Sequence, residues 1–125
     1  MQNYNSKFKT DLKTRCYQFS LASIKLIDSL PKERSCWIIS DQLLRAAMSI
    51  GANLVEASAS SSRLEFKRFH EIALKSANET KYWLGLLKDS AKADKDQVDV
   101  LLNEVNQLAN MIAAGIMKLK GKINF

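Results

Sequence analysis

A line of polar residues in the middle of the chain has residue types and spacing that suit binding or catalysis. The line consists of Arg45, Ser49, Asn53 and Glu56. These positions recur at steps of four, four and three, so they share one side of a helix. A second pair, Ser76 and Glu79, lies near the buried seam of a later helix.

Two interpretations of these polar residues are open. The residues form a polar binding or catalytic cluster, or they form a buried network, for example Arg45 against Glu79, that fixes helix register. We favour the structural network, because polar groups are costly to bury unpaired.

Other signatures of catalysis are missing from the sequence. His70 is the only histidine, so no Glu-x-x-His or His-x-x-x-His metal spacing exists. There is no Gly-rich phosphate loop, serine elbow or Cys-His pair. Cys16 and Cys36 should lie roughly 20 Å apart in an antiparallel helix pair, too far for a disulfide. We therefore expect a non-enzymatic protein with free thiols, no metal and no cofactor.

Positive charge gathers in three short groups along the chain. The net charge is +6, with 19 Lys and Arg against 13 Asp and Glu, a balance that permits contact with nucleic acid. The groups are Lys7, Lys9 and Lys13; Arg63, Lys67 and Arg68; and Lys118, Lys120 and Lys122. In a bundle of alternating helices all three groups should reach the same end. We predict one basic rim there that binds nucleic acid; the alternative is charge that serves solubility alone.

Apolar periodicity predicts four helices of similar length. They are expected at about Asn5 to Leu30, Ser35 to Ala57, the Ser62 cap to Ala91, and Gln97 to Lys120. Pro31 stops the first helix, and Ser62 with Glu65 forms a capping box at the third. At three core positions the spacing fits either of two neighbouring residues. These are Ala46 or Ala47, Ile72 or Ala73, and Leu101 or Leu102. Short connections predict an all-α, antiparallel up-down-up-down four-helix bundle, with residues 1–125 as one domain.

Nothing in the sequence suggests export or membrane insertion. The N-terminal residues lack the apolar stretch of a signal peptide. The longest charge-free run, from Val105 to Met117, is too short to span a bilayer. We therefore expect a cytoplasmic protein with no membrane partner.

The first two helices carry more apolar surface than a single core requires. In the second helix one stripe, through Leu43, Ile50 and Leu54, is expected to face the core. A second stripe, well round the helix, consists of Trp37, Leu44, Met48, Gly51 and Val55. The first helix has a similar extra group of Tyr17, Leu21 and Ile24. Because a monomer that exposed such patches would be prone to aggregate, we predict a homo-oligomer. Its interface residues are Tyr17, Leu21, Leu44, Met48 and Val55.

Two stretches within residues 41–87 carry a paired pattern. It comprises Gln42, Arg45, Ala46, Ser49, Ile50, Asn53 and Glu56, followed by Glu65, Phe66, Phe69, Ala73, Ser76 and Glu79. This pattern resembles the bacterial four helix bundle protein family, also called 23S rRNA intervening-sequence proteins, and the likeness extends over nearly the whole chain. The family usually has Gly after the residue matching Glu56, where this chain has Ala57. We expect that departure to shift the end of the second helix and leave the fold intact.

The resemblance implies assembly and a class of partners. It implies a homopentameric ring, and kinship with the accessory variability protein of diversity-generating retroelements. That relative is a basic pentameric barrel that binds its reverse transcriptase and, through charge, nucleic acid. We expect a non-enzymatic, basic homo-oligomer that binds RNA or a ribonucleoprotein. The alternative is a protein-interaction scaffold or adaptor, for example for a reverse transcriptase, without direct nucleic-acid binding.

Overall fold

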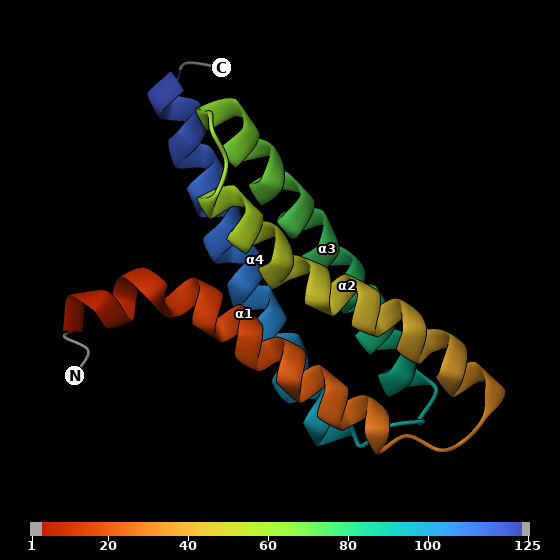
Figure 1. Ribbon diagram of the computed structural model, residues 1–125. Helices are drawn as coiled ribbons and strands as arrows, with labels where there is room; N and C mark the ends of the chain where they lie inside the picture. The colour runs from red at the N-terminus through yellow and green to blue at the C-terminus, as the bar shows by residue number, and fades with distance from the viewer. Residues whose placement is uncertain (1–3, 124–125) are drawn as a thin grey trace.

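The computed structural model describes residues 4–123, with side chains placed for residues 12–121. Its helices are α1 (Tyr4–Asp28), α2 (Arg34–Ser58), α3 (Arg63–Asp89) and α4 (Lys95–Ile123). Each helix packs against its neighbours in sequence, and α1 also packs against α4, whereas the diagonal pairs do not adjoin in the described chain (Figure 1). This arrangement confirms the predicted all-α, up-down-up-down four-helix bundle.

The helices begin and end within about one turn of the predicted residues, for local chemical reasons. α1 ends at Asp28 and not at Leu30, because a residue that precedes proline is disfavoured in the α conformation. At the start of α3 the Ser62 hydroxyl accepts the Glu65 N–H at 3.1 Å. The Glu65 carboxylate in turn accepts the N–H of Ser61 at 3.1 Å, one residue earlier than in the usual capping box.

The C-terminal end of α3 is closed by a left-handed residue. α3 ends at Asp89, and Ala91 has a φ of 57°, in the region that favours glycine. The Ala91 N–H donates to the Lys88 carbonyl at 3.1 Å, and the Lys92 N–H donates to the Leu87 carbonyl at 3.2 Å. These two bonds form a Schellman motif, so the chain leaves the helix two residues before the predicted end.

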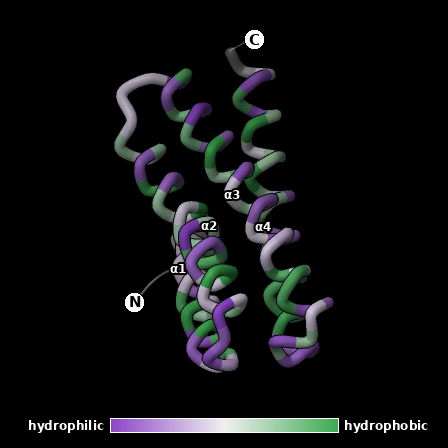
Figure 2. Tube along the Cα trace, turned by 90° about the vertical axis from the view of Figure 1, so that its right-hand side faces the viewer, coloured by the Kyte–Doolittle hydropathy of each residue, from purple (hydrophilic) through white to green (hydrophobic). Residues whose placement is uncertain are grey.

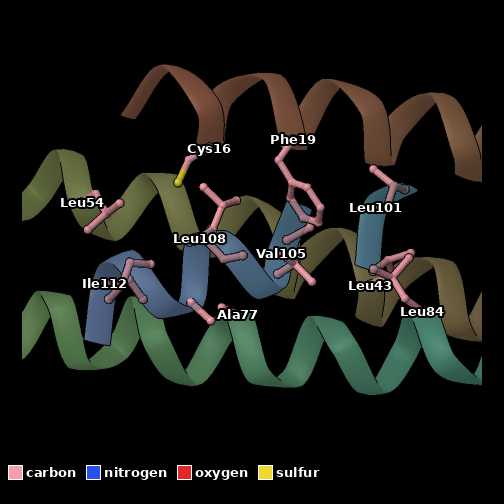
Figure 3. Close-up of a cluster of buried hydrophobic side chains, with 14 of the residues drawn as sticks. Cys16, Phe19, Leu43, Leu54, Ala77, Leu84, Leu101, Val105, Leu108 and Ile112 are labelled. Atoms are coloured by element: carbon pink, nitrogen blue, oxygen red, sulfur yellow. The ribbon is translucent and has the colours of Figure 1, made fainter. Parts of the chain in front are cut away.

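The core is formed by side chains from all four helices. Hydrophobic and hydrophilic residues alternate along each helix with a helical period (Figure 2). Figure 3 shows Phe19 of α1 pointing towards Val105 of α4, and both side chains are buried. Ala73 takes the core position on α3, whereas Ile72 is 44% exposed. The other fully buried large side chains include Leu26, Leu43, Ile50, Leu84, Leu87, Leu108 and Ile112.

Helices α1 and α2 approach each other closely at Gly51. A Cβ atom placed on Gly51 would lie 3.1 Å from the Cβ of Cys16, tighter than an ordinary van der Waals contact. Cys16 is itself buried, so its side chain has little room to move. The missing side chain of Gly51 therefore sets how near α1 lies to α2. Gly85 in α3 differs, because a Cβ there would meet nothing within 4 Å.

Alanine substitutions at these two glycines should have opposite effects on stability. In Gly85→Ala we expect a gain of about 0.5–1 kcal/mol in the free energy of unfolding, because alanine is the better helix former. In Gly51→Ala the same gain is outweighed by overpacking against Cys16, which costs about 1–3 kcal/mol. Urea melts followed by circular dichroism measure both. Equal gains for the two variants would show that α1 does not depend on the close approach.

Candidate interaction surfaces

An apolar groove runs along the outer side of α1 and α2. It has a volume of about 390 Å³, and its walls are Tyr17, Ser20, Leu21, Ile24, Met48, Gly51, Ala52 and Val55, with Lys13 at its edge. Tyr17 is 66% exposed, Val55 58% and Leu21 46%. The structure thus brings together four of the five predicted interface residues. Tyr17 and Leu21 come from α1, and Met48 and Val55 come from α2. The groove offers hydrophobic docking and few polar groups.

The fifth predicted interface residue lies elsewhere. Leu44 is half-buried and does not line the groove. Ile24, which is 38% exposed, and Ala52 take part in it instead. The sequence signal for Ile24 was its place in the extra apolar group of the first helix. The sequence gave no reason to assign Ala52 to an interface, because small residues such as alanine are common on any helix surface.

The outer part of the polar line on α2 pairs with α3 at the protein surface. Arg45 Nη2 donates to Glu79 Oε2 and to Gln42 Oε1 at 2.9 Å. The Trp83 indole N–H donates to the same Glu79 oxygen at 2.8 Å. The side chains of Arg45 and Glu79 are 56% and 36% exposed. The pair named in the sequence interpretation therefore exists, but the expectation that it is buried is wrong, because Arg45 projects from the outer edge of α2.

The inner part of the polar line is a small hydrogen-bonded cluster between α2 and α3. The Ser76 hydroxyl donates to Ser49 Oγ at 2.9 Å. Asn53 Nδ2 donates to the same oxygen at 2.9 Å and to the Ser49 carbonyl at 2.8 Å. Glu56 is exposed and has no partner among the described side chains, so it does not belong to the network. The cluster joins two helices, and none of its fully buried side-chain oxygen or nitrogen atoms lacks a hydrogen-bond partner.

Removing Arg45 should change stability only slightly. A buried, unpaired Glu79 would cost about 3–5 kcal/mol, whereas an exposed pair contributes about 0–1 kcal/mol. For Arg45→Ala we therefore expect a loss below about 1 kcal/mol in urea melts at pH 7. A loss of several kcal/mol would mean that assembly buries the pair.

The same pair predicts a weak acid dependence of stability. The Trp83 hydrogen bond, and then Arg45, lower the pKa of Glu79 below its usual value. The stabilisation is therefore fully present above the unfolded pKa of about 4.3 and is lost as the pH falls through the folded pKa. We expect the small loss in Arg45→Ala to disappear in strong acid, where wild type and variant should melt alike.

Two of the three basic groups share one end of the bundle. Arg63 of α3 and Leu119 of α4 line one surface hollow of about 420 Å³ beside the α2–α3 loop. Their basic neighbours Arg68, Lys118 and Lys120 are exposed. Lys67 is different, because its side chain is only 15% exposed and pairs with Glu71 at 3.3 Å. The positive surface at this end therefore consists of Arg63, Arg68, Lys118 and Lys120, which we call the loop-end cluster.

The third basic group lies on α1, and Lys13 is its member whose side chain the structure describes. Lys13 lies at the edge of the apolar groove, and Figure 1 shows the first turns of α1 leaning away from the end that holds the α2–α3 loop and the last turns of α4. The side chains of Lys7, Lys9 and Lys122 lie outside the described residues. Lys13 borders the groove together with Val55, which lies about one turn before the end of α2. The continuous basic rim therefore stays a prediction.

The remaining candidates for chemistry have structural partners. His70 Nδ1 lies 2.9 Å from the Phe66 carbonyl oxygen, and the His70 and Phe66 rings are in contact, with centroids 4.4 Å apart and planes tilted by 39°. Burial raises the pKa of the Cys16 thiol to about 12, which keeps it protonated and unreactive. Both cysteines are free and buried. Among the described residues, no group of three or more His, Cys, Asp or Glu side chains gathers to hold a metal ion.

The sequence interpretation missed one contact between α1 and α4. Arg15 Nε and Nη2 donate to the two oxygens of Glu104 at 2.9 and 2.7 Å, and Nη2 also donates to Gln107 at 2.8 Å. This fork ties α1 to α4 in a partly buried position. Glu104 and Gln107 lie 89 and 92 residues after Arg15 in the sequence, so no local sequence pattern predicts the contact.

Comparison with known proteins places this architecture in a family. Residues 9–114 match the 23S rRNA-intervening sequence protein family. The chain belongs to that family. A crystal structure of a protein of unknown function from the S23 ribosomal protein family of Bacteroides thetaiotaomicron is similar, with a TM-score of 0.79 and 33% sequence identity over 84% of this chain and 97% of that one. No curated protein matches the chain.

The family membership confirms the resemblance drawn from the paired pattern in α2 and α3. Ala57, where the resemblance led us to expect glycine, is buried inside α2. The helix ends at Ser58, one residue after the predicted end. None of the described helices is long and apolar enough to cross a membrane. Neither the family description nor that of the solved relative names a reaction.

Proposed function

We propose that this 23S rRNA-intervening sequence family member assembles with copies of itself through the α1–α2 groove and binds RNA through its loop-end cluster. The observation that carries the proposal is the separation of two surfaces on one small bundle. An apolar groove lies along one side, and exposed basic residues lie at the end of α4 and the start of α3.

Assembly is supported by the chemistry of the groove. Each Å² of apolar surface removed from water contributes roughly 25 cal/mol, and Tyr17, Leu21 and Val55 leave much of theirs in water in the monomer. A second copy of the chain is the natural occupant of the groove, because it is always present at the same concentration as the first. A ring uses two different faces of each subunit, and the family resemblance favours five subunits.

RNA binding is supported by charge and by the family to which the chain belongs. The net charge is +6, and the exposed cations of the loop-end cluster form no ion pair with a carboxylate among the described side chains. Phe66 of this region is half-buried and its ring contacts the ring of His70, so it is not a free platform for bases. Contacts to phosphates should therefore lead, with weak sequence preference.

A titration at several salt concentrations tests the proposal. We expect the assembled protein to bind a structured RNA, with an affinity that falls steeply as salt rises because phosphate counterions are released. Duplex DNA serves as the comparison, since it carries phosphates without the 2′-hydroxyl. Absence of binding to both at low salt would overturn the RNA role.

That negative result would favour the second candidate, a scaffold for a protein partner. The specific observation in its favour is the shape of the α1–α2 groove, which lies between two helices as the grooves that seat amphipathic helices do. In that case the positive charge serves solubility.

A further inference from the structure

A second hollow lies at the turn between α1 and α2, at the end of the bundle opposite the loop-end cluster. Its volume is about 350 Å³, and Trp37, Ser40, Leu30, Pro31, Asp28 and Asp41 line it. Trp37 is 61% exposed. Neither the proposed assembly nor the proposed RNA surface uses this hollow, and we call it the turn pocket.

Ser40 gives the turn pocket an open hydrogen-bonding group. Its side chain belongs to a residue that is only 8% exposed, yet its hydroxyl has no hydrogen bond to any described residue. No fully buried side-chain oxygen or nitrogen in the described part of the chain lacks a partner. The Ser40 oxygen must therefore be reached from the hollow that it lines, where a ligand can bond it.

The charge of the turn pocket is negative in a chain that is otherwise basic. Asp28 and Asp41 both line it, and neither has an ion pair or hydrogen bond among the described side chains. Asp28 is also the last residue of α1, where the helix carries about half a negative charge, so a carboxylate is unfavourable there without a cation.

The cationic side chain in the lining does not cancel the charge of the two carboxylates. Lys32 is the cationic residue in the lining and stands against two carboxylates. Lys92 is engaged with Glu33, whose carboxylate oxygen lies 2.8 Å from the lysine nitrogen. The pocket therefore keeps one net negative charge.

The lining selects an organic cation over a metal ion. An ammonium group has three donors and no acceptor, and the pocket offers three acceptors: two carboxylates and the Ser40 hydroxyl. Leu30 and Pro31 form an apolar wall that suits an alkyl chain, and the Trp37 face attracts a cation. A hydrated Mg²⁺ gains nothing from these apolar walls. We propose that the turn pocket binds a primary alkylammonium cation, such as one end of a diamine.

Nuclear magnetic resonance of the two tryptophan indole N–H groups tests this proposal with an internal control. Putrescine is added to nitrogen-15-labelled, nucleic-acid-free full-length protein. We expect a saturable shift of the Trp37 signal, with a dissociation constant of about 1 mM or tighter. The Trp83 signal should not move, because that indole bonds Glu79 of α3 and does not line the turn pocket. Signals are assigned with Trp37→Phe.

Matched variants locate the binding groups. Asp41→Asn should weaken binding by about tenfold, because a charge-assisted hydrogen bond is lost, and Ser40→Ala should weaken it by about threefold. Neither change removes a hydrogen bond of the fold. Glu56→Gln removes the same charge at an exposed site outside the pocket and should leave binding unchanged.

Two further ligands separate the possible sources of the cation. Stronger binding of putrescine than of N-acetyl-lysine methylamide assigns the site to a free amine, and the reverse order assigns it to a lysine side chain; both outcomes support the ammonium chemistry. A Trp37 shift produced equally by Mg²⁺, no Trp37 shift with any amine, or equal weakening by Glu56→Gln and Asp41→Asn overturns the proposal.

Discussion

Replacing Met48 by glutamate should convert the assembled protein to a monomer of 14.1 kDa without unfolding it. Met48 lines the α1–α2 groove and is 44% exposed in the single chain. In a monomer the new carboxylate remains in water, so the fold loses little. In an assembly it is taken out of water without a partner, at a cost of several kcal/mol per interface. Sedimentation equilibrium at micromolar concentration measures the change.

The matched control is the same substitution at another exposed methionine. Met117 of α4 is 66% exposed and lies outside the groove, so Met117→Glu should keep the wild-type mass. Circular dichroism should show the same helical content in both variants. A wild-type protein that sediments as a monomer, or an assembled Met48→Glu variant, would sink the proposed interface.

Removing Arg63 and Arg68 together should strongly weaken binding to RNA, whatever the RNA sequence. Both are exposed residues of the loop-end cluster, and the ring would repeat them in each subunit. Each lost phosphate contact flattens the slope of log affinity against log salt by about 0.7 to 0.9. We expect an affinity loss on the order of tenfold or more at low salt. Filter binding or fluorescence anisotropy at several salt concentrations measures both quantities.

A double variant at the other end of the bundle provides the control for net charge. Arg34 and Lys95 are exposed and begin α2 and α4, so their removal costs the same two charges away from the loop-end cluster. Arg34→Ala with Lys95→Ala should leave most of the affinity. Equal losses in the two double variants would show that RNA responds to overall charge, and the cluster would then have no special role. Lys67 is left unchanged, because Glu71 already holds it.

The sequence predicted the bundle well because helix formation and helix amphipathicity are nearly local properties. The four predicted segments match α1 to α4 to within about a turn. The second apolar stripes on the first two helices also follow from spacing alone, since residues three and four apart share a face. That is why Tyr17, Leu21, Met48 and Val55 could be named before their groove was known.

The sequence was less informative wherever the answer depends on how one helix is rotated or tilted against another. It suggested a buried network around Arg45, yet the Arg45 side chain is 56% exposed. Residue spacing shows which face of the helix a side chain lies on, but not how deeply that face is buried. It did not predict that Lys13 borders the apolar groove between α1 and α2. It gave no hint of the fork from Arg15 to Glu104.

The sequence by itself determined the number of helices, their order, their antiparallel connection and their apolar faces. Only the tertiary structure decided the rotation and tilt of α1, which follow from packing contacts such as Cys16 against Gly51. Those contacts join residues distant in sequence, and their energies depend on fit within a fraction of an ångström. The same packing opens the turn pocket around Ser40, a site that residue spacing does not encode.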